Sequence, residues 1–213
     1  MMLILYYHPL SSYCWKVLIA LYELDLPFER RIVNLGDADE RTAFLDVWPI
    51  GKLPVLQDEG RAIPESSIIV EHLDHIAGGG RLVPQDGREA WKARAADRFY
   101  DQHIQTPMQK IVTDRLRPAG ESDAFGVGQA RSQLGVALGL IEADMTKSWA
   151  VGERFSMADC AAAPALYYAN RVAPFAKTHP CTTGYLERLK ARPSCARVLA
   201  EAEPYFAMFP GGA

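Results

Sequence analysis

Cysteine is scarce in this chain of 213 residues, which contains four of them at wide spacings. Cys14, Cys160, Cys181 and Cys195 form no Cys-x-x-Cys pair and join no histidine in a zinc-ligand pattern. A secreted domain that depends on disulfides carries a denser cysteine framework. The sequence therefore predicts a reduced, cytoplasmic protein without a metal site.

Basic clusters and long apolar runs are also missing. The 23 Lys and Arg residues are outnumbered by 26 Asp and Glu residues, and the net charge of −3 offers no footprint for nucleic acid or an anionic membrane. The N-terminal MMLILYY has no basic residue ahead of its short apolar run, unlike a secretory signal. No stretch approaches the roughly 20 apolar residues of a membrane span. We expect neither nucleic acid nor a membrane as a partner.

What the chain does contain is the composition of an ordinary globular protein, with 49% hydrophobic and 23% charged residues. A length of 213 residues suits two small domains or one large one. A Gly-Gly-Gly triplet at 78–80, followed by a proline and another glycine, marks a break in the pattern. We therefore predict one domain at 1–77, a linker at 78–87 and a second domain at 88–213.

Strand and helix patterns alternate before this break. Short apolar runs indicate strands, and a run that is apolar on nearly every side indicates a buried helix after the first strand. The resulting order, strand-helix-strand-helix-strand-strand-helix, predicts an α/β layer structure. The predicted strands lie at 3–7, at 28–33 and on the two sides of a turn at 58–61, and the predicted helices at 13–24, 37–45 and 64–77.

No strand-like alternation appears after residue 88, so the second domain should be all-helical. A long helix is predicted at 88–116, with a kink at Pro107 because proline lacks the N–H of the helical ladder. Ser156 and Asp159 match a capping box, which opens an alanine-rich helix apolar on nearly all sides. Further helices are predicted at 122–147, 180–191 and 193–202.

The first candidate site is Ser11-Ser12-Tyr13-Cys14, between the first strand and its buried helix. The unpaired N–H groups and the dipole of a helix N-terminus favour a negative charge and lower the pKa of a nearby thiol. A serine that only caps the helix is the commoner arrangement, so both interpretations stay open at this point. Cys14 is expected to be a buried, inert side chain.

Two further segments suit a peptide-like ligand. Pro54 opens a strand after a turn, and a cis bond there would expose the backbone of Leu53, although a plain turn is more common. Glu65 and Ser66 stand at a helix start, where backbone N–H groups bind carboxylates and Glu65 could accept a hydrogen bond from an ammonium group. A simple capping pair is an equally good interpretation of Glu65 and Ser66.

The order and spacing of these segments resemble the cytosolic glutathione transferase superfamily, in its bacterial, serine-type, zeta- or theta-like form. The matching segments are YYHPLSSYCWKVLIAL, IGKLPVL, PESSIIVEHL and, in the second half, FSMADCAAAPAL. The resemblance covers nearly the whole chain. It implies a thioredoxin-like βαβαββα domain followed by an all-helical domain, with glutathione as co-substrate and a homodimeric assembly.

By this resemblance, Glu65 and Ser66 hold the γ-glutamyl end of glutathione. The Leu53 backbone, next to Pro54, pairs with the cysteinyl unit like an added strand, and Lys52 meets the glycyl carboxylate. Ser11 donates a hydrogen bond to the thiolate, with Ser12 as its alternative. Tyr6 and Tyr7 are further hydroxyl candidates, and we expect both to be structural.

The implied reaction is conjugation of glutathione to a small hydrophobic electrophile. The electrophile pocket is expected between the domains, lined by Leu10, Tyr13, Tyr100, His103 and Met108, with Gln105 as a further candidate. The same thiolate could serve an isomerase or a dehalogenase. Maleylacetoacetate isomerases carry Ser-Ser-Cys-Ser, and Tyr13 and Cys14 depart from that motif. A thiol reductase would need cysteine at position 11, and a non-catalytic glutathione-binding protein is the remaining alternative.

Overall fold

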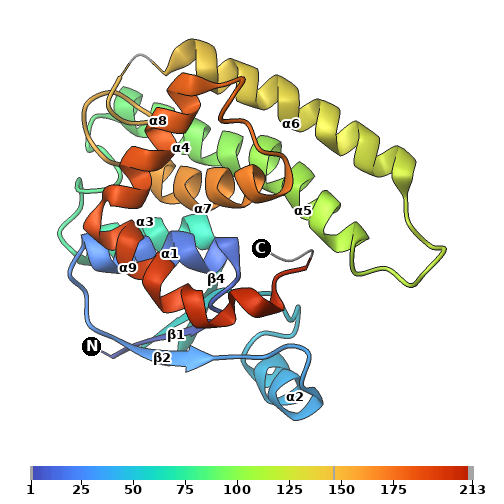
Figure 1. The fold of residues 1–213 in the computed structure, drawn as a ribbon. Coiled ribbons are helices and arrows are strands. Elements are labelled where there is room, and N and C mark those ends of the chain that lie inside the picture. Colours follow the sequence, from blue (N-terminus) through green and yellow to red (C-terminus); the bar gives the residue numbers. More distant parts are fainter. Residues whose placement is uncertain (1, 146, 211–213) are drawn as a thin grey trace.

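The computed structural model describes residues 2–145 and 147–210 and shows a small α/β unit beneath a larger group of helices (Figure 1). This arrangement confirms the predicted thioredoxin-like domain followed by an all-helical domain. No helix within the described residues is both long enough and apolar enough to cross a membrane.

The sheet of the first unit has the strand order β2-β1-β3-β4. β2 runs parallel to β1, whereas β3 pairs antiparallel with both β1 and β4. The strands are β1 (Leu3–Tyr7), β2 (Phe28–Ile32), β3 (Val55–Asp58) and β4 (Arg61–Pro64), and the helices are α1 (Ser12–Glu23), α2 (Ala38–Val47) and α3 (Ser66–Ile76).

Helix α1 is buried on nearly every side, as its apolar sequence predicts. It packs against α3 within its own unit and against α7 (Met157–Val172) and α9 (Pro193–Ala202) of the helical unit. One continuous apolar core therefore runs through both units. The loop at the start of α1 is fixed from both sides.

The helical unit contains six α-helices and two short segments within the described residues. It begins with α4 (Gly87–Phe99), which continues through the π-helix η1 (Tyr100–Gln105) into α5 (Thr106–Asp114). The remaining elements are α6 (Ala124–Asp144), α7, α8 (Pro180–Ala191), α9 and the 3₁₀ segment η2 (Glu203–Met208).

The predicted single helix at 88–116 is corrected by the π-helix. Pro107 has no N–H and its ring would crowd the carbonyl four residues earlier. The chain widens ahead of it, so that the Thr106 N–H donates to the carbonyl of Asp101, five residues back. This changes which side chains of the segment face the α/β unit.

The segment between α3 and α4 is held in place rather than loose. The buried Asp74 carboxylate accepts hydrogen bonds from four backbone N–H groups of residues 80–83, at 2.7–3.3 Å. This explains how a glycine-rich segment fixes the helical unit against the α/β unit. The domain limits at 77/78 and 87/88 stay a prediction.

Candidate active site

Two adjoining cavities form a cleft between the units. The larger one, of about 770 Å³, lies between the β1–α1 loop, the loop after β2, α5 and α7. The smaller one, of about 240 Å³, lies between the β3 approach, the start of α3, and the α4–η1 segment. Both are lined by Tyr13, Lys52, Leu53 and Thr106, so they meet along one side.

Ser11 is the N-cap of α1 and lines the larger cavity. Its backbone is extended, and its hydroxyl oxygen accepts a hydrogen bond from the Cys14 N–H at 3.4 Å. That arrangement leaves the hydroxyl proton available to a ligand. The first turn of α1 contains no acidic residue, so the positive end of the helix is not neutralised there.

Ser12 is buried and accepts a hydrogen bond from the side-chain amide of Gln105 in η1. It touches the larger cavity, but its hydroxyl is engaged with the helical unit. Gln105, which the sequence placed in the electrophile pocket, is instead buried behind Ser12. Both serines line the larger cavity, and Ser11 is the more exposed of the two while Ser12 is the one bonded to the helical unit.

The other nucleophile and hydroxyl candidates lie away from the cleft. Cys14 is fully buried, and burial raises the pKa of its thiol to about 12 against hydrogen bonds from Ser11 and His8 that lower it. Tyr7 is buried in the core, and burial raises the pKa of its phenol. Tyr6 packs on Phe44 with ring centroids 6.0 Å apart. None of the three lines either cavity.

The peptide bond between Leu53 and Pro54 is cis, so the rarer of the two arrangements considered for this turn is the one observed. Leu53 precedes β3, so its backbone groups lie outside the sheet ladder and beside both cavities. Lys52 is exposed at the same rim. An extended peptide bound along this rim could form hydrogen bonds with the Leu53 backbone and an ion pair with Lys52.

Glu65 and Ser66 bring a second helix N-terminus to the cleft. Both line the smaller cavity, where Ser66 is the buried first residue of α3 and Glu65 its exposed N-cap. Glu65 has φ +69° and makes no capping hydrogen bond with its side chain. A non-glycine residue at positive φ is uncommon and costs about 1–3 kcal/mol, so the backbone at Glu65 is strained at the edge of the smaller cavity.

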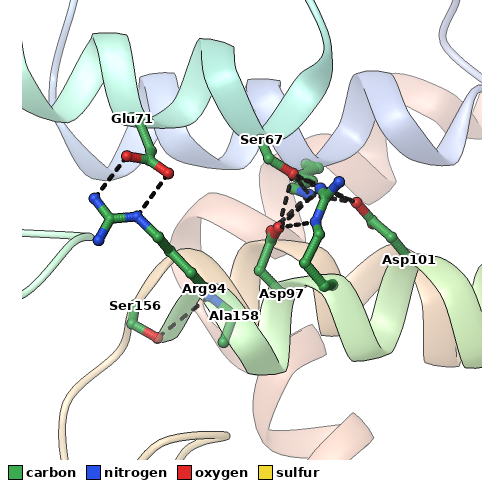
Figure 2. A network of polar contacts seen from close by, with 9 residues as sticks. Ser67, Glu71, Arg94, Asp97, Asp101, Ser156 and Ala158 are labelled. Carbon is green, nitrogen blue, oxygen red and sulfur yellow. Dashed lines mark hydrogen bonds and ion pairs between the residues drawn. The ribbon is translucent and has the colours of Figure 1, made fainter. Parts of the chain in front are cut away.

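The helical unit contributes residues to the smaller cavity that the sequence analysis missed. Arg98 and Asp101 line it, together with Gln102 and Thr106. Arg98 donates to the Asp101 carboxylate at 2.7 Å, next to a buried polar cluster around Ser67 (Figure 2).

That buried cluster centres on Lys16 of α1, whose ammonium lies 2.5 Å from Asp97 and 2.8 Å from Asp101. Lys16 also donates to the hydroxyl of Ser67, which in turn donates to Asp97 at 2.7 Å. The signal was present in the sequence, because a lysine within an otherwise apolar helix needs a buried counter-charge.

The walls of the larger cavity are mostly apolar. Leu10, Tyr13 and Met108 line it as the sequence analysis expected. Four further wall residues were not predicted from the sequence: Val112 of α5, Leu116 just after it, Tyr168 of α7 and Phe209 of the C-terminal segment. Phe209 reaches the cleft because the C-terminal segment folds back onto it.

Tyr100 and His103 do not line the cleft, which corrects their assignment to the electrophile pocket. Tyr100 is buried in the helical core against Phe99, with ring centroids 5.7 Å apart. His103 is exposed, and its ring centroid lies 5.3 Å from that of Phe99. Both residues belong to the π-helix η1, whose wider turn places successive side chains at other angles than an α-helix does.

The larger cavity contains little charge. No acidic side chain lines it among the described residues, and Lys52 is its only permanent cation there. Burial lowers the pKa of His8 against an opposing effect of Glu40, and its Nδ1 accepts from the Leu10 N–H at 3.2 Å. His8 is therefore neutral near pH 7. Within 2–145 and 147–210, no group of three or more His, Cys, Asp or Glu side chains is arranged to hold a metal ion.

Comparison with known proteins agrees with this geometry. The family model of the glutathione S-transferase N-terminal domain matches residues 5–81, and that of the C-terminal domain matches residues 99–193. A probable maleylacetoacetate isomerase of Caenorhabditis elegans is 30% identical over 172 residues, which cover 79% of each chain. FtsZ-localized protein A of Caulobacter vibrioides is 29% identical over 214 residues, covering 94% of this chain and 92% of the relative.

A solved structure gives the same result. The crystal structure of a glutathione S-transferase from Methylobacillus flagellatus KT with glutathione bound superposes with a TM-score of 0.85. It is 25% identical, and the match covers 92% of this chain and 98% of that one. With both domain models matched in order and the fold shared along nearly the whole length, the chain belongs to the glutathione S-transferase superfamily.

Proposed function

We propose that this protein is a glutathione S-transferase that activates the glutathione thiol with the Ser11 hydroxyl. The observation that supports it best is the presence of two helix N-termini at one cleft, α1 at Ser11 and α3 at Ser66. Each N-terminus favours an anion. Glutathione has a carboxylate at one end and an ionisable thiol at its middle, so one extended molecule could meet both.

In this arrangement the γ-glutamyl end occupies the smaller cavity. Its carboxylate meets the N–H groups at the start of α3 and the Ser66 hydroxyl, while Glu65 accepts from the ammonium group. The cysteinyl unit pairs with the backbone of Leu53, and Lys52 meets the glycyl carboxylate. The thiol then lies in the larger cavity beside Ser11. The mainly apolar walls around it suit a hydrophobic electrophile.

The energy required is within reach of the groups present. A thiol with an ordinary pKa of about 8.5 is mostly protonated at neutral pH, and lowering that pKa by about two units needs ~2.7 kcal/mol. A hydrogen bond to a charged group contributes about 1.5–3 kcal/mol, and a helix N-terminus about 0.3–1 kcal/mol. Ser11 at the start of α1 supplies both interactions at one position. The thiolate then attacks the electrophilic carbon or displaces its leaving group.

Isomerase chemistry on the same thiolate is the second candidate, because a probable maleylacetoacetate isomerase is among the relatives. Its named substrate is a dicarboxylate, which calls for cations in the pocket. The described lining of the larger cavity offers only Lys52 as a permanent cation. This favours the transferase over the isomerase, and an assay of both electrophiles and maleylacetoacetate separates them. The zeta- or theta-like assignment and a homodimeric assembly are proposals from the family resemblance.

The deciding experiment is a titration of enzyme-bound glutathione by ultraviolet difference spectroscopy. We expect a thiol pKa about two units below that of free glutathione in the wild type. Ser11→Ala should raise the pKa of the bound thiol most of the way back to that of free glutathione. Ser12→Ala should change this pKa little, because the Ser12 hydroxyl is bonded to Gln105. Binding with an unshifted thiol pKa in all three proteins would instead support a non-catalytic glutathione-binding protein.

A further inference from the structure

The peptide unit that joins Leu10 to Ser11 is hydrogen-bonded at both of its ends. The Ser11 N–H donates to the carbonyl of His8 at 3.0 Å. The Leu10 carbonyl accepts from the hydroxyl of Tyr168 at 2.8 Å. A peptide unit is planar, so these two bonds fix its orientation and with it the direction in which Ser11 leaves the backbone.

The Tyr168 ring is itself held on several sides. It stacks on Phe209 with centroids 5.4 Å apart and an interplanar angle of 23°. Its centroid also lies 5.0 Å from that of Trp15 and 5.3 Å from that of Tyr167. Only 1% of the residue is exposed, and burial raises the pKa of its phenol, so the hydroxyl stays protonated and able to donate.

We propose that Tyr168 is a positioning residue for Ser11: its hydroxyl, reaching from α7 of the helical unit, sets the backbone of the α1 N-cap in the orientation that activates glutathione. The proposal rests on the serine mechanism proposed above. Tyr168 lies 158 positions after Leu10 in the sequence, in the helical unit. The activating loop of the α/β unit is therefore completed by the other unit.

Loss of the hydrogen bond from Tyr168 to Leu10 should change the orientation of the Ser11 backbone and leave the packing of the core as it is. Without the hydroxyl, the ring still packs against Phe209 and Trp15, and the core keeps its shape. Leu10 lines the larger cavity, so water there can bond to its carbonyl in place of Tyr168. The Ser11 backbone then has freedom to rotate, and the hydroxyl spends less time aimed at the thiolate.

The test compares Tyr168→Phe with Tyr167→Phe, a matched control one residue away on α7. The Tyr167 hydroxyl accepts from Arg171 at 3.4 Å and has no hydrogen bond to the β1–α1 loop within the described residues. For Tyr168→Phe we expect the acid dissociation constant of the bound thiol to fall about three- to tenfold, the range of one lost hydrogen bond. The dissociation constant of glutathione and the thermal midpoint should change little, and Tyr167→Phe should leave the thiol unchanged.

A double-mutant cycle with Ser11→Ala decides whether the effect passes through the serine. In that background Tyr168→Phe should cause no further change in thiol ionisation. A further change there, an equal effect of Tyr167→Phe, or no effect of Tyr168→Phe in an otherwise wild-type protein would each overturn the proposal. Failure of the serine mechanism itself is recognised separately, because Ser11→Ala alone would then leave the pKa of the bound thiol at its wild-type value.

Discussion

Glu65 carries conformational strain at the place where the γ-glutamyl end of glutathione is proposed to bind. Glycine reaches positive φ without the steric cost of a Cβ atom, and an L-residue there loses about 1–2 kcal/mol. Glu65→Gly should therefore raise the free energy of unfolding by about 1 kcal/mol, while glutathione binds more weakly because the side-chain carboxylate is gone. Urea unfolding and calorimetric titration with glutathione measure the two effects.

Glu59 provides the matched control at the same scale. It has φ +48° in the tight turn between β3 and β4, next to Gly60 at φ +81°, and lies outside both cavities. Glu59→Gly should stabilise the fold to a similar extent without changing glutathione affinity. If Glu65→Gly destabilised the protein while Glu59→Gly stabilised it, the Glu65 side chain would have a structural role as well.

At the level of elements, α8 begins without a side-chain cap from its own N-cap residue. Glu142 of α6 supplies the acceptor instead, receiving the N–H groups of Cys181 at 2.9 Å and Thr182 at 2.8 Å. Burial acts to raise the pKa of this carboxyl, but the hydrogen bonds from Thr182 and Cys181 outweigh it and lower the pKa to about 2. The carboxylate thus joins two helices that are far apart in sequence.

The pH dependence of this cap follows from the sign of the shift. Because the folded pKa lies below the unfolded value, the stabilisation is fully present above about pH 4.3 and is lost as the pH falls through about 2. Glu142→Gln should lower the free energy of unfolding by about 1 kcal/mol at pH 7. Urea titrations should show a smaller gap between the two proteins at pH 3, and a gap that does not depend on pH would contradict the assignment.

The capping box of α7 makes a second prediction at this scale. Asp159 is fully buried and accepts from the Ser156 N–H, the Ala150 N–H and the Tyr185 hydroxyl, at 2.6–2.9 Å. Ser156→Ala should cost about 1 kcal/mol, the usual price of a lost cap. Asp159→Ala should cost clearly more, because it also leaves the buried Tyr185 hydroxyl and the partly buried Ala150 N–H without an acceptor. Chemical denaturation of both variants gives the order, and an equal loss would contradict it.

The whole molecule depends on the polar cluster that joins α1 and α3 to the α4–η1 segment. Lys16 and Asp97 are each about 1% exposed, so Lys16→Met would leave carboxylates buried without their cation. Breaking a buried pair in this way costs about 3–5 kcal/mol. We therefore expect a large loss of stability in urea unfolding, together with loosening of the two units.

Arg94 offers a control, because its direct but solvent-exposed ion pair with Glu71 also joins α3 to α4 (Figure 2). It bonds both carboxylate oxygens of Glu71, at 2.9 and 2.7 Å, but its side chain is 47% exposed. An exposed pair contributes about 0–1 kcal/mol, so Arg94→Gln should have a minor effect. Equal losses of unfolding free energy in Lys16→Met and Arg94→Gln would show that burial does not decide how much an ion pair contributes to stability.

The order of the elements and the positions of the three candidate binding segments could be read from the amino-acid sequence. Those features depend on local patterns: the apolar run of α1, the cap at Ser156 with Asp159, and the prolines and glycines of the turns. The cis bond before Pro54 was the rarer alternative for an X–Pro pair, whereas the turn at this position and the placement of Ser11 at a helix N-terminus could be predicted for the same reason. Each is set by residues within a few positions of one another.

Tertiary structure alone decided which side chains meet at the cleft. Tyr100 and His103 of the π-helix lie outside it, since the rotation of a long helix is set by its packing as well as by its own sequence. The engagement of Ser12 by Gln105 and of Leu10 by Tyr168 joins positions 93 and 158 residues apart. Such contacts depend on how two units dock, and no periodicity within either unit encodes the distance between them.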